Sequence, residues 1–273
     1  MIRFAVSSDT PAVIDLWNRC FGDDPAFTEW FFRNRYRPEE TLLLLEDKTL
    51  CAMVQMLPYT LRTKEKNCAV TYIYGACTAP EHRRKGLMAQ LLAESFRIDR
   101  QKGRGASVLI PAEPWLFGFY KKYGYETAFW VSNQQIPYDP EATDVGEIIP
   151  LTDDDSETLE SLYRNHAGET CLCRTAEDWK CQIQMFRDLG GMPLGWRFAG
   201  ELRGYAFVWN NDDGLWAQEL MTGNRECMAQ MILRYYHADS MKATFPGTEQ
   251  RLGCIRYHDD SPVESGYFNL LFN

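Results

Sequence analysis

The residues best suited to chemistry stand together between Pro80 and Met88, in the run Pro-Glu-His-Arg-Arg-Lys-Gly-Leu-Met. Two arginines and a lysine supply positive charge, and Gly86 lets the backbone approach a ligand closely. A predicted strand precedes this run and a predicted helix follows it, so unpaired amides at the positive end of the helix dipole would face the loop. Positive side chains beside free amides predict a binding site for a diphosphate.

The order of residue types excludes two common phosphate-binding loops. No Ser or Thr follows a Gly-Lys pair here, as the P-loop of nucleotide hydrolases requires, and the G-x-G-x-x-G of dinucleotide sites is missing. Basic residues before a helix can also form an ordinary solvated turn. The complete order of strand, Pro80, Arg83, Arg84, Gly86 and helix favours the binding site instead.

The pattern Arg-x-x-Gly-x-(Gly/Ala), with a strand before it and a helix after it, resembles the acyl-CoA loop of the GNAT superfamily of N-acetyltransferases. Met88 stands where that pattern usually ends in a small residue. The wider string Ala-Pro-x-His-Arg-Arg-Lys-Gly-Leu-Met is similar to that of the enhanced-intracellular-survival branch. That branch adds a third, sterol-carrier-like domain, which we expect this chain to lack.

The resemblance implies acetyl-CoA as cosubstrate and a place for each part of it. Two parallel strands, Tyr72–Thr78 and Ala106–Ile110, would separate and hold the pantetheine amides along the open edge of the first. The loop would hold the pyrophosphate, and two residues beyond the second strand would line the cleft. Cys77 is interpreted as a small packing residue, with a covalent acyl-cysteine as the alternative. The implied binding set is Ala76, Cys77, Thr78, Arg83, Arg84, Lys85, Gly86, Leu87, Met88, Ala89, Ala112 and Glu113.

Amine acetylation also needs an acid for the departing thiolate and a base for the attacking amine. The segment from Leu116 to Glu126 resembles the family's Phe-Tyr-x-x-Phe-Gly-Tyr, which places the family's general acid on Tyr120. A phenol with a pKa near 10 is protonated at neutral pH. The alternative for Tyr120 is an aromatic that only packs under the sheet. In the enhanced-intracellular-survival enzymes a terminal carboxylate is the base, which here would be that of Asn273. Glu29, Glu113 or a chain of waters are the alternatives.

The elements that must position these residues follow a recognisable order. The first half predicts β–α–α–β–β–β–α–β–α–β over about Ile2–Ile136, and a polar, proline-bearing linker follows. The same order then returns, but the turn at Gly223–Cys227 lacks the basic loop and adds a glutamate where phosphate would lie. We therefore predict an α/β protein of tandem GNAT folds, each a mixed central sheet flanked by helices. Residues 1–138 would be the acetyltransferase domain, and residues 146–273 a degenerate GNAT-like domain without an acyl-CoA loop.

Composition narrows the class of partner. The chain has 273 residues, of which 45% are hydrophobic and 25% charged, and this composition is typical of a globular protein. The net charge of -9 argues against nucleic acid or an anionic membrane as the main partner. Nine scattered cysteines and four histidines show no metal-ligand spacing, so no metal is expected. Without a signal-peptide pattern or an apolar run of about 20 residues, a cytoplasmic location is expected. Whether the protein is a homo-oligomer stays open.

The sequence thus favours an acetyl-CoA-dependent N-acetyltransferase that transfers acetyl to a primary amine of a small molecule by direct attack on the thioester. One alternative is a non-catalytic protein that binds acyl-CoA and regulates a partner. A second is a tRNA-dependent aminoacyl transferase, which the acidic net charge disfavours.

Overall fold

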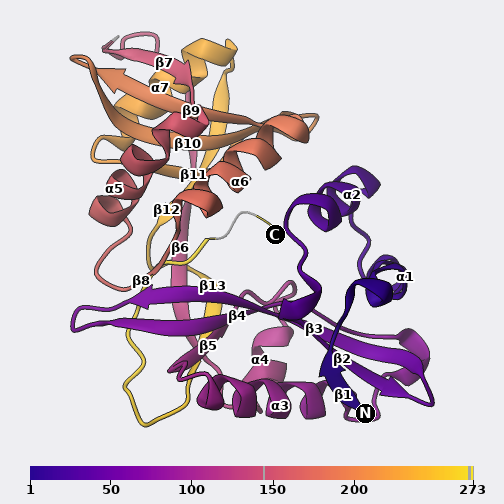
Figure 1. The fold of residues 1–273 in the computed structure, drawn as a ribbon. Coiled ribbons are helices and arrows are strands. Elements are labelled where there is room, and N and C mark those ends of the chain that lie inside the picture. The colour runs from indigo at the N-terminus through magenta and orange to yellow at the C-terminus, as the bar shows by residue number, and fades with distance from the viewer. Residues whose placement is uncertain (144, 270–271, 273) are drawn as a thin grey trace. The chain divides into compact units, whose positions relative to one another are not determined.

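The computed structural model describes every residue except 144, 270, 271 and 273, and it divides into two compact units. The first comprises Met1–Ala128 with Gly253–Glu264, and the second comprises Phe129–Leu252 with Ser265–Asn273. Each unit contains a mixed sheet with helices on both faces (Figure 1). The predicted fold class is confirmed.

The first unit has the predicted element order, and its helices are amphipathic with the apolar side toward the sheet. Its sheet runs β1-β2-β3-β4-β5-β13, in which only β4 and β5 are parallel neighbours. Helices α1 and α2 lie on one face, and α3 and α4 on the other (Figure 1). The elements are β1 (Ile2–Phe4), α1 (Thr10–Cys20), α2 (Pro25–Asn34), β2 (Thr41–Glu46), β3 (Thr49–Arg62), β4 (Asn67–Thr78), α3 (Leu87–Gln101), β5 (Ala106–Leu109), α4 (Leu116–Lys121) and β13 (Gln250–Tyr257).

The second unit repeats this plan. Its sheet runs β6-β12-β11-β10-β9-β7, with β11 and β12 as the parallel pair. Helices α5 and α6 cover one face, and α7 packs on the other through a core of Met, Ile, Leu and Ala side chains. The elements are β6 (Glu126–Pro137), β7 (Glu147–Pro150), α5 (Ser156–His166), β8 (Cys171–Cys173), α6 (Ala176–Asp188), β9 (Met192–Phe198), β10 (Glu201–Asn211), β11 (Gly214–Thr222), α7 (Arg225–Tyr236) and β12 (Ser240–Pro246).

A buried ion pair lies in the interior of the second unit. Both terminal nitrogens of Arg174 donate hydrogen bonds to the Glu219 carboxylate, at 2.6 and 2.7 Å, and both side chains are fully buried. Tyr205 and Tyr267 donate to the same carboxylate, and the guanidinium lies over the ring of Trp179 at 4.5 Å. A buried carboxylate with this many donors is satisfied, so we interpret it as structural.

The strands that complete each sheet come from unexpected parts of the chain. The strand predicted at Ala128–Ile136 exists as β6, but its residues Val131–Pro137 pair with β12 of the second unit. The edge of β5 in the first unit is paired instead with Cys254–Tyr257 of β13. The units therefore differ from the predicted ranges 1–138 and 146–273, because a strand's pattern specifies that it pairs but not with which strand.

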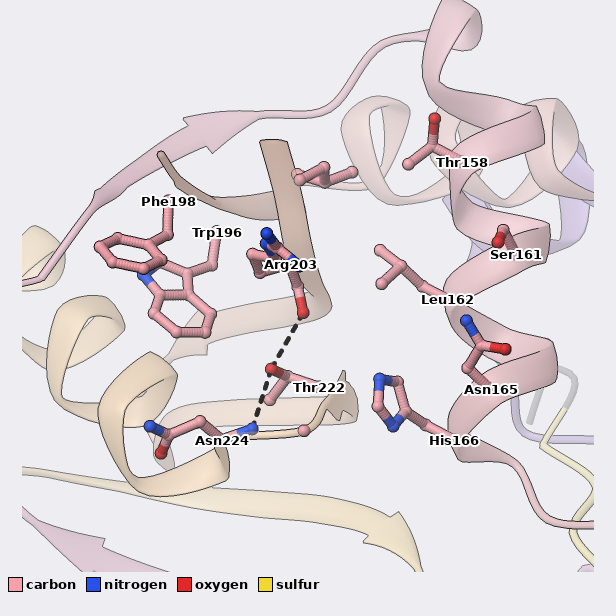
Figure 2. Close-up of a pocket in the computed structure, with 12 residues that line it drawn as sticks. Thr158, Ser161, Leu162, Asn165, His166, Trp196, Phe198, Arg203, Thr222 and Asn224 are labelled. Carbon is pink, nitrogen blue, oxygen red and sulfur yellow. Dashed lines mark hydrogen bonds between the residues drawn. The ribbon is translucent and has the colours of Figure 1, made fainter. Parts of the chain in front are cut away.

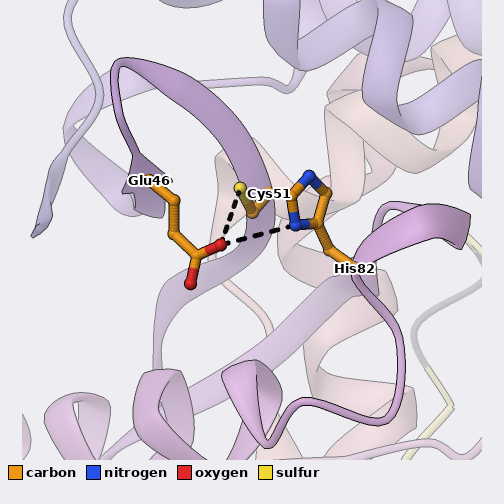
Figure 3. Close-up of side chains that lie close together, drawn as sticks. All are labelled: Glu46, Cys51 and His82. Carbon is orange, nitrogen blue, oxygen red and sulfur yellow. Dashed lines mark hydrogen bonds and ion pairs between the residues drawn. The ribbon is translucent and has the colours of Figure 1, made fainter.

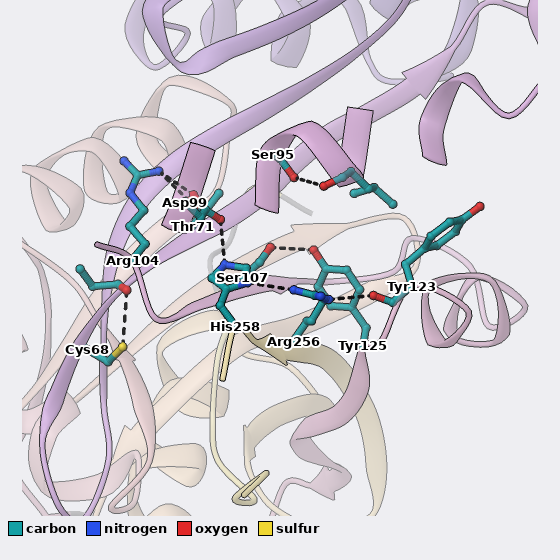
Figure 4. Close-up of polar contacts among 12 residues, drawn as sticks. Cys68, Thr71, Ser95, Asp99, Arg104, Ser107, Tyr123, Tyr125, Arg256 and His258 are labelled. Atoms are coloured by element: carbon teal, nitrogen blue, oxygen red, sulfur yellow. Dashed lines mark hydrogen bonds and ion pairs between the residues drawn. The ribbon is translucent and has the colours of Figure 1, made fainter. Parts of the chain in front are cut away.

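A polar network fixes β13 in the first unit (Figure 4). The carboxylate of Asp99 in α3 is fully buried and contacts Thr71, Arg104 and His258. Arg256 of β13 donates to the carbonyl of Tyr123 at 2.9 Å and contacts the His258 ring at 2.9 Å. A charged network of this kind is costly to break, so residues 253–264 belong to the stability of the first unit.

Two smaller differences complete the comparison of elements. The predicted last strand, Tyr267–Phe272, is no strand over its described residues, where Tyr267 forms only an isolated bridge with Cys171. The short strand β8 was not predicted. Among the described helices, none combines the length and the hydropathy needed to cross a membrane.

Candidate active site

The two parallel strands of the first sheet separate part of the way along. Their pairing runs from Val70↔Ala106 to Tyr72↔Val108, whereas β4 continues to Thr78. The far edge of β4 in this last stretch stays paired with β3. The near edge therefore presents main-chain N–H and C=O groups to the gap, where an extended ligand with amide groups could pair with them.

A β-bulge interrupts β4 in the same stretch. Gln55 pairs with Tyr74 and Met53 pairs with Cys77, so β4 has one residue more than β3 between these pairs. Gly75 has φ +55, and a Cβ there would lie 2.6 Å from the Trp17 ring of α1. Only glycine combines this conformation with such a close approach, so Trp17 and Gly75 together set the direction of the strand's end.

The loop after β4 leaves its amides open. Arg84 and Gly86 both have positive φ, at 63° and 75°, and Gly86 is the N-cap of α3 without a side chain to cap it. Among the described residues, none accepts a hydrogen bond from the main-chain N–H of Leu87, Met88 or Ala89. These are the first three amides of a fifteen-residue helix, so their N–H groups are available to an anion.

The side chains of the loop differ in how freely they can meet a ligand. Arg83 donates its Nε to the Thr78 carbonyl at 3.2 Å, and Lys85 contacts the His82 ring at 3.5 Å. Arg84 is exposed and makes no ion pair with a described residue. Of the three basic side chains, Arg84 has the most freedom to reach a phosphate. Of the other predicted binding residues, Leu87 and Cys77 are buried, Ala112 and Glu113 are exposed, and Ala76, Thr78, Met88 and Ala89 are half-buried.

Two side chains of the β2–β3 hairpin and one of this loop lie close together (Figure 3). Glu46 of β2, Cys51 of β3 and His82 of the loop bring ligand atoms within 4.8 Å of one another. The sequence spacing predicted no metal, because this proximity comes from the β2–β3 hairpin meeting the loop. The Glu46 carboxylate lies 3.5 Å from the His82 ring, so the contact ties the loop to the hairpin when His82 is protonated.

Tyr120, the predicted general acid, lies in α4 and is 7% exposed. Burial raises the pKa of its hydroxyl well above the usual value, and the neighbouring Cys254 and Cys77 add to this effect. The hydroxyl therefore keeps its proton at neutral pH, as an acid for a thiolate must. Tyr120 belongs to the same buried cluster as Ile73 of β4 and Cys254 of β13.

The structure distinguishes among the other reactive candidates. Burial raises the pKa of the Cys77 thiol well above its usual range, which makes it a poor nucleophile at neutral pH and argues against an acyl-cysteine. Glu29 is exposed and paired with Arg33, and Glu113 is exposed in the loop after β5. Asn273 lies outside the described residues.

A pocket lies between α1 and α2. Its volume is about 730 Å³. Aromatic rings and carboxylates line it together, including Phe21, Phe32, Asp23 and Glu29. Asp23 also accepts a hydrogen bond from the Trp17 indole at 2.8 Å. The sequence signal was the aromatic stripe of these helices beside Asp23-Asp24, although nothing in the sequence shows that the two helices leave a cavity.

The corresponding position of the second unit is built differently. There, β11 and β12 also separate, since their pairing ends at Ala217↔Ala243 while β11 continues to Thr222. The first turn of α7, however, is capped by its own Asn224, whose side chain accepts from the Cys227 amide at 3.2 Å. Arg225 packs over the Phe245 ring at 4.1 Å.

A pocket of about 550 Å³ lies beside this turn (Figure 2). Its walls are polar side chains of α5, among them Asn165 and His166, and the aromatic pair Trp196 and Phe198 of β9. It contains no basic loop of the kind seen at Arg83–Gly86. That the second unit does not bind acyl-CoA stays a prediction.

Comparison with known proteins agrees with this geometry. The model of the acetyltransferase (GNAT) domain matches residues 1–128. An uncharacterised N-acetyltransferase of Streptomyces griseus is 33% identical over 64 residues, which cover 23% of this chain and only 15% of that relative.

Solved structures share the fold over nearly the whole chain. A protein of Enterococcus faecalis V583, described as a probable N-acyltransferase, has a TM-score of 0.77 at 16% identity and covers 94% of this chain and 72% of its own. A GCN5-related N-acetyltransferase of Anabaena variabilis has a TM-score of 0.76 at 16% identity. The match covers 95% of this chain and 73% of the other. Eis1 of Mycobacterium abscessus has a TM-score of 0.70 at 14% identity. The match covers 95% of this chain and 74% of the other. The first 128 residues of this chain are therefore an acetyltransferase domain of the GNAT family.

Proposed function

We propose that this protein transfers the acetyl group of acetyl-CoA to a primary amine of a small molecule, by direct attack of the amine on the thioester. The observation that supports this most is the combination of an open β4 edge with a basic loop and three unpaired helix amides. The strand edge matches the amides of pantetheine, and the loop matches its diphosphate. Tyr120 would protonate the departing thiolate.

The pocket between α1 and α2 favours an acceptor that carries positive charge. Carboxylates next to aromatic rings bind ammonium groups by charge and by cation–π attraction, and this pocket is lined by the exposed Asp23 together with Phe21 and Phe32. Glu29 also lines it, but its carboxylate is paired with Arg33, another lining residue. We therefore place the acceptor amine there. The net charge of -9 is consistent with attraction of a cationic substrate.

Calorimetry with acetyl-CoA, followed by a thiol-release assay with a panel of small amines, tests the proposal. Binding together with amine-dependent release of coenzyme A is expected. Binding without turnover across a broad panel would favour the non-catalytic alternative. Absence of binding would remove the acyl-CoA assignment itself. A salt-sensitive shift of tRNA in a gel would instead favour the tRNA-dependent alternative.

A further inference from the structure

Three side chains beside the basic loop have no part in the proposed reaction (Figure 3). Glu46, Cys51 and His82 offer a carboxylate oxygen, a sulfur and an imidazole nitrogen within 4.8 Å of one another. The Glu46 Oε2 lies 3.5 Å from the His82 Nδ1 and 4.0 Å from the Cys51 Sγ. Donors about 2.0–2.3 Å from a shared tetrahedral ion lie roughly 3.3–3.6 Å apart. A small movement of the side chains would therefore place all three around one ion.

The backbone brings these side chains together. The pairing of β2 with β3 shifts by one residue between Leu44 and Leu45, and Cys51 is the extra residue of this β-bulge. The Cys51 carbonyl accepts a hydrogen bond from the Ala79 amide at 2.8 Å, which attaches the beginning of the loop to the hairpin. The next turn is closed by a hydrogen bond of 2.8 Å from the His82 amide to the Ala79 carbonyl. Main-chain contacts thus hold the loop beside the bulge.

The donor set selects the kind of ion. Mg²⁺ and Ca²⁺ take oxygen ligands, whereas a sulfur with an imidazole and a carboxylate suits Zn²⁺. Cys51 is buried, but the Glu46 side chain is 48% exposed and that of His82 is 19% exposed. An ion can therefore enter from the side of Glu46. The Cys51 thiol donates to the Thr49 carbonyl at 3.3 Å, and the ion would replace this proton on sulfur.

We propose that Glu46, Cys51 and His82 form a zinc site, in which the carboxylate, the thiolate and the imidazole Nδ1 are ligands and water is the fourth. The S–H bond of Cys51 breaks and its proton passes to solvent as the zinc–sulfur bond forms, with no change of oxidation state. Because a proton is released, zinc binding should tighten as the pH rises. The ion would link the loop to the β2–β3 hairpin immediately before Arg83 and Arg84.

Lys85 opposes the ion. Its ammonium lies 3.5 Å from the His82 Nδ1, the same nitrogen that faces Glu46. Lys85 is exposed, so it can turn away when an ion binds, but its charge still repels the ion. Lys85→Ala should therefore tighten metal binding by about threefold, given the screening by salt. Unchanged or weaker binding by this variant would overturn coordination through Nδ1.

Titration with Co²⁺ tests the site, because the colour of this ion reports its ligands. The full-length protein is kept reduced with a phosphine, stripped of metal with a chelator and then titrated. We expect saturation at one ion per chain, with the visible bands of a tetrahedral ion and a thiolate-to-cobalt charge-transfer band in the near ultraviolet. Zn²⁺ should displace Co²⁺ and remove both. At about a hundredfold excess over its Kd, Zn²⁺ should also raise the melting temperature by about 5 °C.

Variants of each ligand locate the bound ion. C51S should lose the charge-transfer band, and E46Q and H82A should each weaken Co²⁺ binding at least about tenfold. Circular dichroism shows whether C51S is folded, while E46Q and H82A change side chains that are not fully buried. C68S and H237A, which alter a half-buried cysteine and an exposed histidine outside the cluster, are the controls and should bind as the wild type does.

A charge-transfer band that survives in C51S, binding without such a band, or no binding at all would overturn the proposal. None of these outcomes depends on whether acetyl-CoA binds.

Discussion

At the scale of single residues, burial has opposite consequences for the Tyr120 hydroxyl and the Cys77 thiol. It raises the pKa of both Tyr120 and Cys77. For a phenol that must deliver a proton, this keeps the useful form present at neutral pH. For a thiol that would have to attack, it removes the useful form. The same environment therefore supports an acid at Tyr120 and opposes a covalent intermediate on Cys77.

Tyr120→Phe should lower kcat roughly hundredfold, because a positioned general acid contributes about 10²–10⁴. The Kd for acetyl-CoA, measured by calorimetry, should stay unchanged. Since the raised pKa keeps Tyr120 protonated, wild-type kcat should show no loss from its ionisation below about pH 10. Tyr123→Phe, at a half-buried tyrosine nearby, is the control and should keep full activity. Full turnover by the Tyr120 variant would exclude this residue as the acid.

Arg84→Gln should weaken acetyl-CoA binding about tenfold, which corresponds to about 1.4 kcal/mol, and leave kcat little changed. The exposed Arg84 makes no ion pair with a described residue, so its loss should not disturb the loop. When the Kd for acetyl-CoA is measured at two salt concentrations, it should change less with salt in the variant than in the wild type. Arg97→Gln, on the exposed face of α3, removes one positive charge outside the loop. Equal weakening by both variants would show a general charge effect rather than a phosphate contact.

At the scale of elements, the site depends on how β4 ends. The strand separates from β5 after Tyr72, bulges between Tyr74 and Cys77, and ends at Thr78, before Pro80. The bulge in turn depends on α1, because Trp17 occupies the space that a side chain at position 75 would need. Helix α1 thus shapes the candidate cofactor cleft from the opposite face of the sheet.

Gly75→Ala should destabilise the protein by roughly 2 kcal/mol or more, since alanine must adopt φ +55 and its Cβ would meet Trp17 at 2.6 Å. Thermal and urea unfolding measure this loss, and acetyl-CoA affinity should fall with it. Gly118→Ala, in α4, is the control because a Cβ there has nothing within 4 Å. Helix propensity predicts that this control is neutral or slightly stabilising. Similar stabilities of the two variants would contradict the role assigned to the bulge.

At the scale of the whole molecule, the acetyltransferase domain is not continuous in sequence. Residues 1–128 match the family, but their sheet is completed by β13, more than a hundred residues later. His258 and Arg256 bring polar partners to the buried Asp99 and to the carbonyl of Tyr123. Without them, β5 would have an open edge and Asp99 would lose a partner.

A fragment that ends at residue 138 should therefore fail to fold stably, even though it contains every predicted residue of the acyl-CoA loop. It should melt without a cooperative transition and be cut quickly by trypsin, whereas the full chain should resist. In the full chain, His258→Ala should cost about 1–3 kcal/mol by removing a buried partner of Asp99. His237→Ala, at an exposed helix end, should cost less. A cooperative, acetyl-CoA-binding fragment of residues 1–138 would show that β13 is dispensable.

The sequence alone determined the elements and the loop. Alternating and helical hydrophobic patterns predicted nearly every strand and helix of the first unit. The order of Pro80, Arg83, Arg84 and Gly86 predicted an anion site at the start of α3, and this stays a prediction. These features depend on residues close together in the chain, where periodicity, capping and charge act locally.

Only the tertiary structure decided which distant segments meet. It paired β5 with β13 and β6 with β12 of the second sheet, and it left a pocket between α1 and α2. The physical reason is the same in each case. Strand partners, cavities and side-chain contacts are chosen by the packing of the complete chain, and no local pattern of residues specifies them.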